Sequence, residues 1–234
     1  MRKRTASWLP LTLALALTLA SVARAAAPTT FPAIAEETAR PLLLVAQLTA
    51  GGYLPKRAPC DKPGTVCVDL DPPPFWLTAN VISTVHGEAV PAALTLVTTS
   101  HYGMDEYLGP APGLYLARLA TDGNDFVMLR YAKAKLAKKK DGALYLVVYA
   151  PGDIWWLPCS STGLREAVSA EDFAGDLAIA PGDLARYRVS AYPDLFEGTD
   201  RGVVPRYAIS ISRLQQHLAG LDAAATLGTC RRPT

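Results

Sequence analysis

The stretch WLTANVISTVHGEAVPAALTLVTT, residues 76–99, decides the fold. Residues 76–85 are rich in β-branched and apolar side chains, and the His86-Gly87-Glu88 segment that follows has the composition of a turn. From Leu94 to Thr99 successive side chains alternate between two faces, as in a strand that buries one of them. The stretch therefore predicts two neighbouring antiparallel strands.

The same pattern continues on the C-terminal side of this stretch. LYLARL (residues 114–119) and FVMLRY (residues 126–131) are typical of two strands joined by a tight turn at 121–124. In residues 133–149, the pair Asp141-Gly142 is typical of a two-residue type I′ hairpin turn, with Lys140 facing Ala143 across it. The sequence thus predicts one strand after another.

Five lysines occupy the outgoing arm of this hairpin: Lys133, Lys135, Lys138, Lys139 and Lys140. Lysines on an edge strand discourage unwanted strand addition, so this arm is expected at the edge of a sheet. An anion-binding patch is the alternative. The returning arm, residues 144–149, is apolar on both faces and is expected to be central.

The C-terminal third mixes short elements. Ser169 is a plausible N-cap for a helical turn through Glu171 and Asp172. Residues 184–192 resemble a strand, and residues 193–205, with two prolines and two glycines, resemble a long loop. Three leucines at helical spacing predict a helix over 212–224: Leu214, Leu218 and Leu221.

Many short strands with turn signals about every ten residues favour a mainly β fold, either a small barrel or a sandwich. We expect a barrel of the OB type, with a short internal helix and a C-terminal helix. This expectation concerns the fold and carries no function by itself.

The first residues predict export. Four residues, Met1-Arg2-Lys3-Arg4, precede an apolar run over 8–20, and Ala23 and Ala25 form a small-x-small cleavage signal. The run is too short to span a membrane. We therefore expect a signal peptide over 1–25, a lead segment over 26–50, and a single disulfide-stabilised β-rich domain over 51–234. The mature chain is expected in the periplasm or secreted, without a transmembrane segment.

Removal of the signal reverses the net charge. Of the 23 Lys and Arg residues, four leave with it, so 19 remain against 21 acids and the formal charge changes from +2 to −2. Nucleic-acid binding requires a dense positive surface, so it is not expected. No cofactor is expected either.

Four cysteines remain in the mature chain: Cys60, Cys67, Cys159 and Cys230. An even number in an exported chain predicts disulfides. Of the three possible pairings, Cys60–Cys67 with Cys159–Cys230 is favoured, because residues 51–65 form a Gly- and Pro-rich loop that folds back easily. The spacings lack the paired short intervals of a zinc site.

Two clusters are candidates for binding. The first is a polar loop that contains His101, Tyr102, Asp105 and Glu106, where an imidazole and two carboxylates can hold a metal or share a proton, with His86 as a distant third ligand. A solvated loop is the alternative. The second is Trp155-Trp156, because one of two adjacent strand residues faces outward. That ring would stack on a sugar or anchor a partner, unless both rings are covered.

These observations leave two hypotheses for the function of the protein. The first is a non-enzymatic envelope protein that binds another protein or envelope component. The alternative is a small exported hydrolase, or a metal-dependent enzyme, that uses the His101–Glu106 loop. No Gly-x-Ser-x-Gly elbow occurs, and Ser160-Ser161-Thr162-Gly163 resembles a helix or turn entry. The enzyme requires His86, His101 and Asp105 to converge in a concave pocket.

Overall fold

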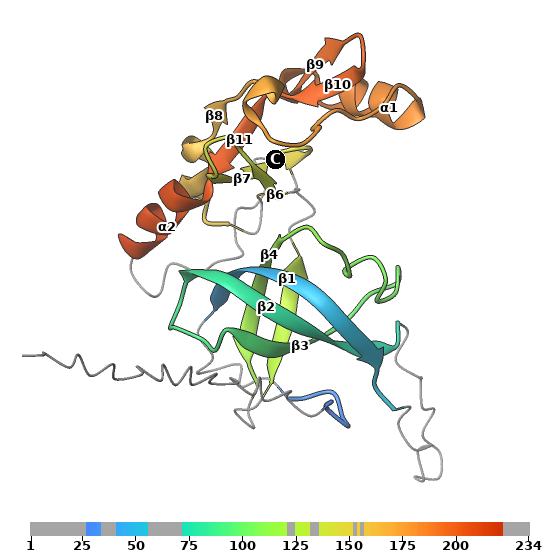
Figure 1. The fold of residues 1–234 in the computed structure, drawn as a ribbon, viewed down its shortest axis with the longest axis vertical. Coiled ribbons are helices and arrows are strands. Elements are labelled where there is room, and N and C mark those ends of the chain that lie inside the picture. Colours follow the sequence, from blue (N-terminus) through green and yellow to red (C-terminus); the bar gives the residue numbers. More distant parts are fainter. Residues whose placement is uncertain are drawn as a thin grey trace, which may run out of the picture.

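The computed structural model describes residues 27–33, 41–55, 72–120, 125–131, 136–151, 154 and 157–221. Its N-terminal half is a closed five-stranded barrel, and its C-terminal half is a layer of sheet and helices that lies against one side of the barrel (Figure 1). The barrel strands are β1 (Leu42–Tyr53), β2 (Pro74–His86), β3 (Ala93–Thr99), β4 (Gly113–Leu119) and β5 (Phe126–Tyr131).

The strand order around the barrel is β1-β2-β3-β5-β4, and β4 pairs again with β1. All neighbours are antiparallel except β3 and β5, which run parallel. A five-stranded Greek-key barrel with this order is the OB arrangement. The expected mainly β fold with an OB-like barrel is therefore confirmed.

Alternation along the strands fills the barrel. In β2, Phe75, Leu77 and Ala79 are fully buried and point inward, while the residues between them are at least partly exposed. β1 begins at Leu42, inside the segment 26–50 that we expected to lead into the domain. Its first residues are buried on both faces, which explains why they are almost all aliphatic.

In its described residues, the C-terminal half contains a four-stranded sheet in the order β6-β7-β11-β8, a separate hairpin of β9 and β10, two α-helices and the 3-10 helices η2, η3 and η4. The strands are β6 (Leu136–Lys138), β7 (Leu144–Val147), β8 (Glu166–Ala167), β9 (Phe196–Thr199), β10 (Gly202–Pro205) and β11 (Tyr207–Ser210). The helices are η2 (Cys159–Leu164), η3 (Ala170–Asp172), α1 (Asp183–Ala191), η4 (Pro193–Leu195) and α2 (Ile211–Ala219).

The described part of the predicted lysine hairpin is present as β6 and β7, while Lys133 and Lys135 lie outside the described residues. β6 lies at the edge of the sheet and β7 is central, as expected. The predicted turn, however, is wrong by one residue. Lys138 pairs with Leu144, the Gly142 amide donates to the Lys139 carbonyl, and only Gly142 has a positive φ, of 95°. The loop is therefore a three-residue turn that ends in a left-handed glycine, rather than a type I′ turn.

Two C-terminal predictions were wrong. Residues 184–191 belong to the helix α1 rather than to a strand, Tyr192 is its C-cap, and an ion pair between Asp183 and Arg186 lies in its first turn. Residues 193–205 form η4 and the β9–β10 hairpin rather than a loop. The short internal helix is present as η3, where the Ser169 hydroxyl caps the amide of Glu171.

The C-terminal helix fixes the two halves to each other. The Ser210 hydroxyl accepts from the amide of Arg213 at the start of α2, and Gly220 ends the helix before the predicted limit at residue 224. Leu214 and Leu218 lie in one apolar core with residues from the outer face of the barrel, which are Leu43, Val45, Val85, Leu114 and Leu116. In the described part of the chain, no helix is long and apolar enough to cross a membrane.

Candidate functional site

Three neighbouring strands of the barrel form a part of its outer surface that lacks charge. β1, β2 and β3 contain no Asp, Glu, Lys or Arg. Where the C-terminal half leaves these strands uncovered, the side chains that point outward are amides, hydroxyls, an indole and an aliphatic group. We call this surface the neutral face, and its residues are Gln47, Gly52, Trp76, Thr78, Asn80 and Ile82.

Trp76 dominates the neutral face, and a glycine determines how its ring lies. Trp76 and Gly52 are cross-strand partners. A Cβ on Gly52 would lie 3.0 Å from the indole Nε1 and 3.3 Å from Cζ2, so the ring rests directly on the glycine. One side of the indole is thus supported by backbone while the residue stays partly exposed, which produces an apolar platform along the sheet.

Polar groups flank this platform on the next rungs of β2. Thr78 pairs with Ala50, and Asn80 pairs with Gln47, whose side-chain amide donates to the carbonyl of Gly109. Asn80 is exposed and offers both donors and acceptors. The neutral face therefore combines one aromatic platform with uncharged hydrogen-bonding groups.

The predicted His101–Glu106 loop closes one end of the barrel. Its apolar residues Met104 and Tyr107 pack on the barrel core, and the Tyr107 ring lies 5.7 Å from that of Phe75. The four predicted site residues point away from this packing and are exposed: His101, Tyr102, Asp105 and Glu106. The loop also contacts the end of β1, because a Cβ on Gly103 would lie 3.2 Å from the Tyr53 hydroxyl.

The structure does not bring His86 to this loop. β2 pairs with the end of β3 at Pro74, just before the loop, whereas His86 is the last residue of β2. The intervening twelve residues correspond to about 40 Å of strand. Burial lowers the pKa of His86, which favours its neutral form. Among the described residues, no group of three His, Cys, Asp or Glu side chains is arranged to hold a metal.

The remaining predicted residues are mostly outside the described part of the chain. This holds for Trp155 and Trp156, and for Cys60, Cys67 and Cys230. Cys159 starts η2 and is not a free thiol. The pairing of the four cysteines stays a prediction.

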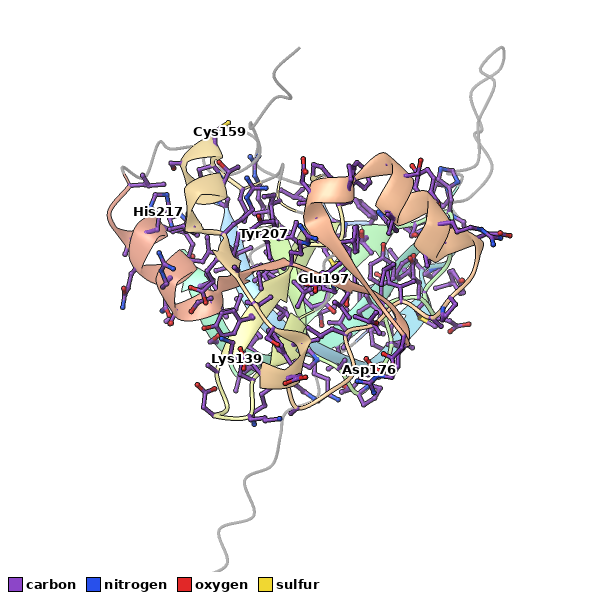
Figure 2. All side chains as sticks on the ribbon, turned by 90° about the horizontal axis from the view of Figure 1, so that it is seen from above. Lys139, Cys159, Asp176, Glu197, Tyr207 and His217 are labelled. Carbon is purple, nitrogen blue, oxygen red and sulfur yellow. The ribbon has the colours of Figure 1, made fainter. Side chains whose placement is uncertain are left out.

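Sequence reasoning missed a contact between a serine and a histidine. Ser160 Oγ lies 2.8 Å from His217 Nε2, which joins η2 to α2 on the side of the molecule where Figure 2 labels Cys159 and His217. The pair is separated by 57 residues and no motif connects them, so only the fold reveals it. One turn earlier on α2, Arg213 forms an ion pair with Glu166 at 2.7 Å, so that carboxylate is already engaged.

Trp76 was also missed as a site residue, although a signal existed. It stands in a strand between residues that point inward, and Gly51-Gly52 provides the only glycine pair in the sequence.

Comparison of the chain with protein-family models, curated proteins and solved structures finds no match.

Proposed function

We propose that the chain is an exported, non-enzymatic binding protein that holds an uncharged glycan of the cell envelope on the neutral face. The observation that carries this proposal is the indole of Trp76, which lies over Gly52 on strands that contain no charged side chain. Sugar rings present flat apolar faces and a periphery of hydroxyls. They therefore suit an aromatic platform flanked by Thr and Asn.

The lack of charged residues on β1, β2 and β3 favours a glycan over a nucleic acid as the ligand of the neutral face. OB-type barrels bind oligonucleotides or oligosaccharides on the surface around β2 and β3. A nucleic acid requires cations for its phosphates, and none is present on β1, β2 or β3. The formal charge of −2 for the mature chain supports the same choice. The OB-like fold alone would not distinguish between a glycan and a nucleic acid as the ligand.

Export is part of the proposal, and the pattern of residues 1–25 supports it. An exported chain is expected to begin near Ala26 and to contain no titratable thiol. Amino-terminal sequencing and thiol titration of the secreted or periplasmic protein test both points. A mature protein that still begins at Met1 and has free thiols would contradict export.

The binding test is calorimetry of the mature protein with a tetramer of N-acetylglucosamine and, separately, with oligothymidylate. We expect the sugar to bind, and Trp76→Ala to weaken binding by about tenfold or more, since aromatic stacking is lost. At physiological salt no binding of oligothymidylate is expected.

Tyr187→Ala is the matched control, because Tyr187 is an aromatic residue that is 58% exposed on α1, away from the neutral face. It should leave sugar binding unchanged. Trp76→Phe keeps a flat ring at this position, so it should retain more sugar binding than Trp76→Ala. This variant distinguishes the loss of the aromatic platform from damage to the barrel. Equal affinities in Trp76→Ala and the unmodified protein, with both folded, would overturn the proposal.

A further inference from the structure

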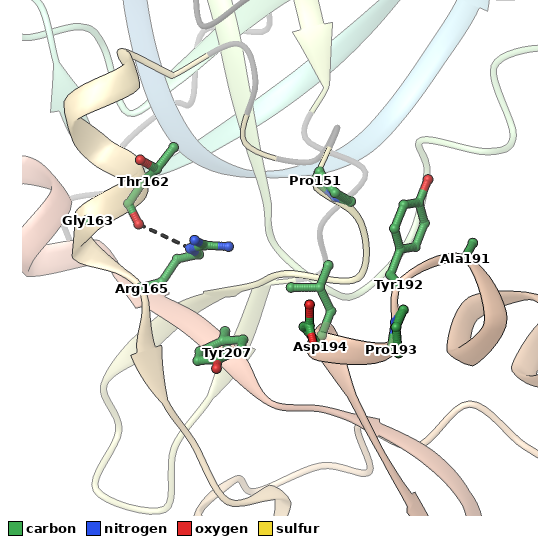
Figure 3. Close-up of a pocket in the computed structure, with 10 residues that line it drawn as sticks. Pro151, Thr162, Gly163, Arg165, Ala191, Tyr192, Pro193, Asp194 and Tyr207 are labelled. Carbon is green, nitrogen blue, oxygen red and sulfur yellow. Dashed lines mark hydrogen bonds between the residues drawn. The ribbon is translucent and has the colours of Figure 1, made fainter. Parts of the chain in front are cut away.

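A pocket lies in the C-terminal half, away from the neutral face. It is bordered on one side by the end of η2 and Arg165, and on the other by the junction of α1 and η4 (Figure 3). Tyr207 of β11 and Pro151 complete its walls. Its volume of about 590 Å³ is in the range of pockets that hold small ligands.

Arg165 provides a fixed cation at this site. Its Nε donates to the carbonyl of Thr162 at 3.1 Å, and its guanidinium carbon lies 5.8 Å from the ring centroid of Tyr207. The hydrogen bond uses only Nε, and the guanidinium group extends toward the pocket (Figure 3). A guanidinium held in this way matches the two oxygens of a carboxylate.

Asp194 provides a carboxylate from the opposite wall. It belongs to η4, directly after Pro193, and Figure 3 draws it pointing toward the same space as Arg165. Within the described ranges, neither Arg165 nor Asp194 forms an ion pair with another side chain. A cation and an anion thus face one pocket without neutralising each other.

The walls between these charges are apolar or aromatic. Tyr192, Pro193 and Leu195 stand beside Asp194, and Tyr207 lies beneath Arg165. A ligand that satisfies both charges must carry a carboxylate and an ammonium group, separated by a body that can contact rings and aliphatic carbon. Free amino acids and short peptides have this chemistry, and the volume suits the larger of them.

We propose that this pocket binds a zwitterionic peptide of about two residues, with its carboxylate on Arg165 and its ammonium group at Asp194. This binding is independent of the glycan site, because no residue of the neutral face lines the pocket. The protein would then hold a sugar polymer and a peptide terminus at separate places.

Calorimetric titration of the mature protein with alanyl-phenylalanine tests the site. Two capped forms of the same peptide separate the two charges: the C-terminal amide lacks the carboxylate, and the N-acetyl form lacks the ammonium group. We expect saturable binding of the dipeptide with a Kd of about 1 mM or below, and weakening of about tenfold for each capped form.

Variants assign each end of the peptide to a residue. Arg165→Gln should weaken the binding of the dipeptide and of its N-acetyl form by about tenfold. It should leave the binding of the C-terminal amide unchanged. Asp194→Asn should weaken the binding of the dipeptide and of its C-terminal amide, and it should leave the binding of the N-acetyl form unchanged. Arg201→Gln and Asp200→Asn, which alter an exposed pair in the β9–β10 turn, are matched controls that should change nothing.

If Arg165→Gln does not fold, Arg165→Lys replaces it, since it keeps the charge and removes the two-point contact. It should weaken binding by less than Asp194→Asn does. The proposal is overturned if no form of the peptide binds at 10 mM. It is also overturned if binding survives both charge substitutions, or if the amide and N-acetyl forms bind as well as the dipeptide.

Discussion

At the scale of single residues, two glycines of β1 decide how the candidate site is built. A Cβ on Gly51 would lie 2.6 Å from Met104 Sδ and 2.6 Å from the carbonyl oxygen of Trp76, while Gly52 supports the indole. We predicted from composition that both glycines belong to a loop over 51–65. In the structure they end a strand, because a glycine inside a strand also marks a place where another group approaches the backbone.

The hydrogen bond between Ser160 and His217 resembles part of a serine-hydrolase site, separate from the His101–Glu106 loop. A nucleophilic serine requires a histidine that an acid orients, together with donors for the oxyanion. Among the described residues, no carboxylate is recorded on His217, and that of Glu166 is paired with Arg213. We therefore expect this bond to join η2 and α2 and to lack reactivity.

The prediction is that a fluorophosphonate probe does not label Ser160. Ser160→Ala should lower the free energy of unfolding by about 1 kcal/mol or less, since the bond is exposed to water. Mass spectrometry of the probe-treated protein and urea unfolding measure the two quantities. Stoichiometric labelling that is lost in Ser160→Ala would instead indicate a hydrolase with Ser160 as its nucleophile.

At the scale of elements, strands were easier to predict than their connections. The limits of β4 and β5 were correct to within a residue, because β-branched and apolar residues stop at turn-forming ones. α1 was missed because its apolar residues Leu184 and Tyr187 are more than half exposed and only Ala185 is buried. An exposed helix needs no amphipathic stripe, so periodicity could not reveal it.

In the turn between β6 and β7, the backbone conformation depends on one residue, Gly142. Gly142 has a φ of 95°, and Asp141 adopts no positive φ. A side chain at position 142 would be strained by about 1–2 kcal/mol, although space is available, since the nearest group to a Cβ is Lys138 at 3.6 Å. The predicted result is therefore backbone strain without a steric clash.

Gly142→Ala should lower the free energy of unfolding by about 1–2 kcal/mol. The midpoint of urea unfolding measures it, and the slope of the transition should not change. Gly175→Ala is the control, because Gly175 has no positive φ and a Cβ there would meet nothing within 4 Å. Equal stabilities of the two variants would show that the turn is not strained as described.

At the scale of the whole molecule, one apolar core joins the barrel to the C-terminal half. β1 contributes to two cores at once, since Leu44 and Ala46 point into the barrel while Leu43 and Val45 point toward the C-terminal sheet. The sequence contains the signal, because LLLVA at 42–46 is apolar on both faces. We assigned this run to a lead segment, and so the partner of its second face could not be foreseen.

This shared core bears on the expected single domain over 51–234. If the two halves depend on each other, removal of side-chain volume from the shared core must destabilise both. Leu214 is fully buried there, and Leu96 is fully buried inside the barrel. Truncation of either leucine should cost about 2–5 kcal/mol, from lost burial and the cavity that remains.

Leu214→Ala should therefore increase amide hydrogen exchange by the same factor in peptides from β1 and β2 as in peptides from β7 and β11. The reason is that exchange from a cooperative unit reports the free energy of unfolding of the whole unit. Leu96→Ala serves as the reciprocal test from the barrel side. If Leu214→Ala accelerates exchange only in the C-terminal strands and leaves β1 and β2 protected, the halves unfold separately and the chain has two domains rather than one.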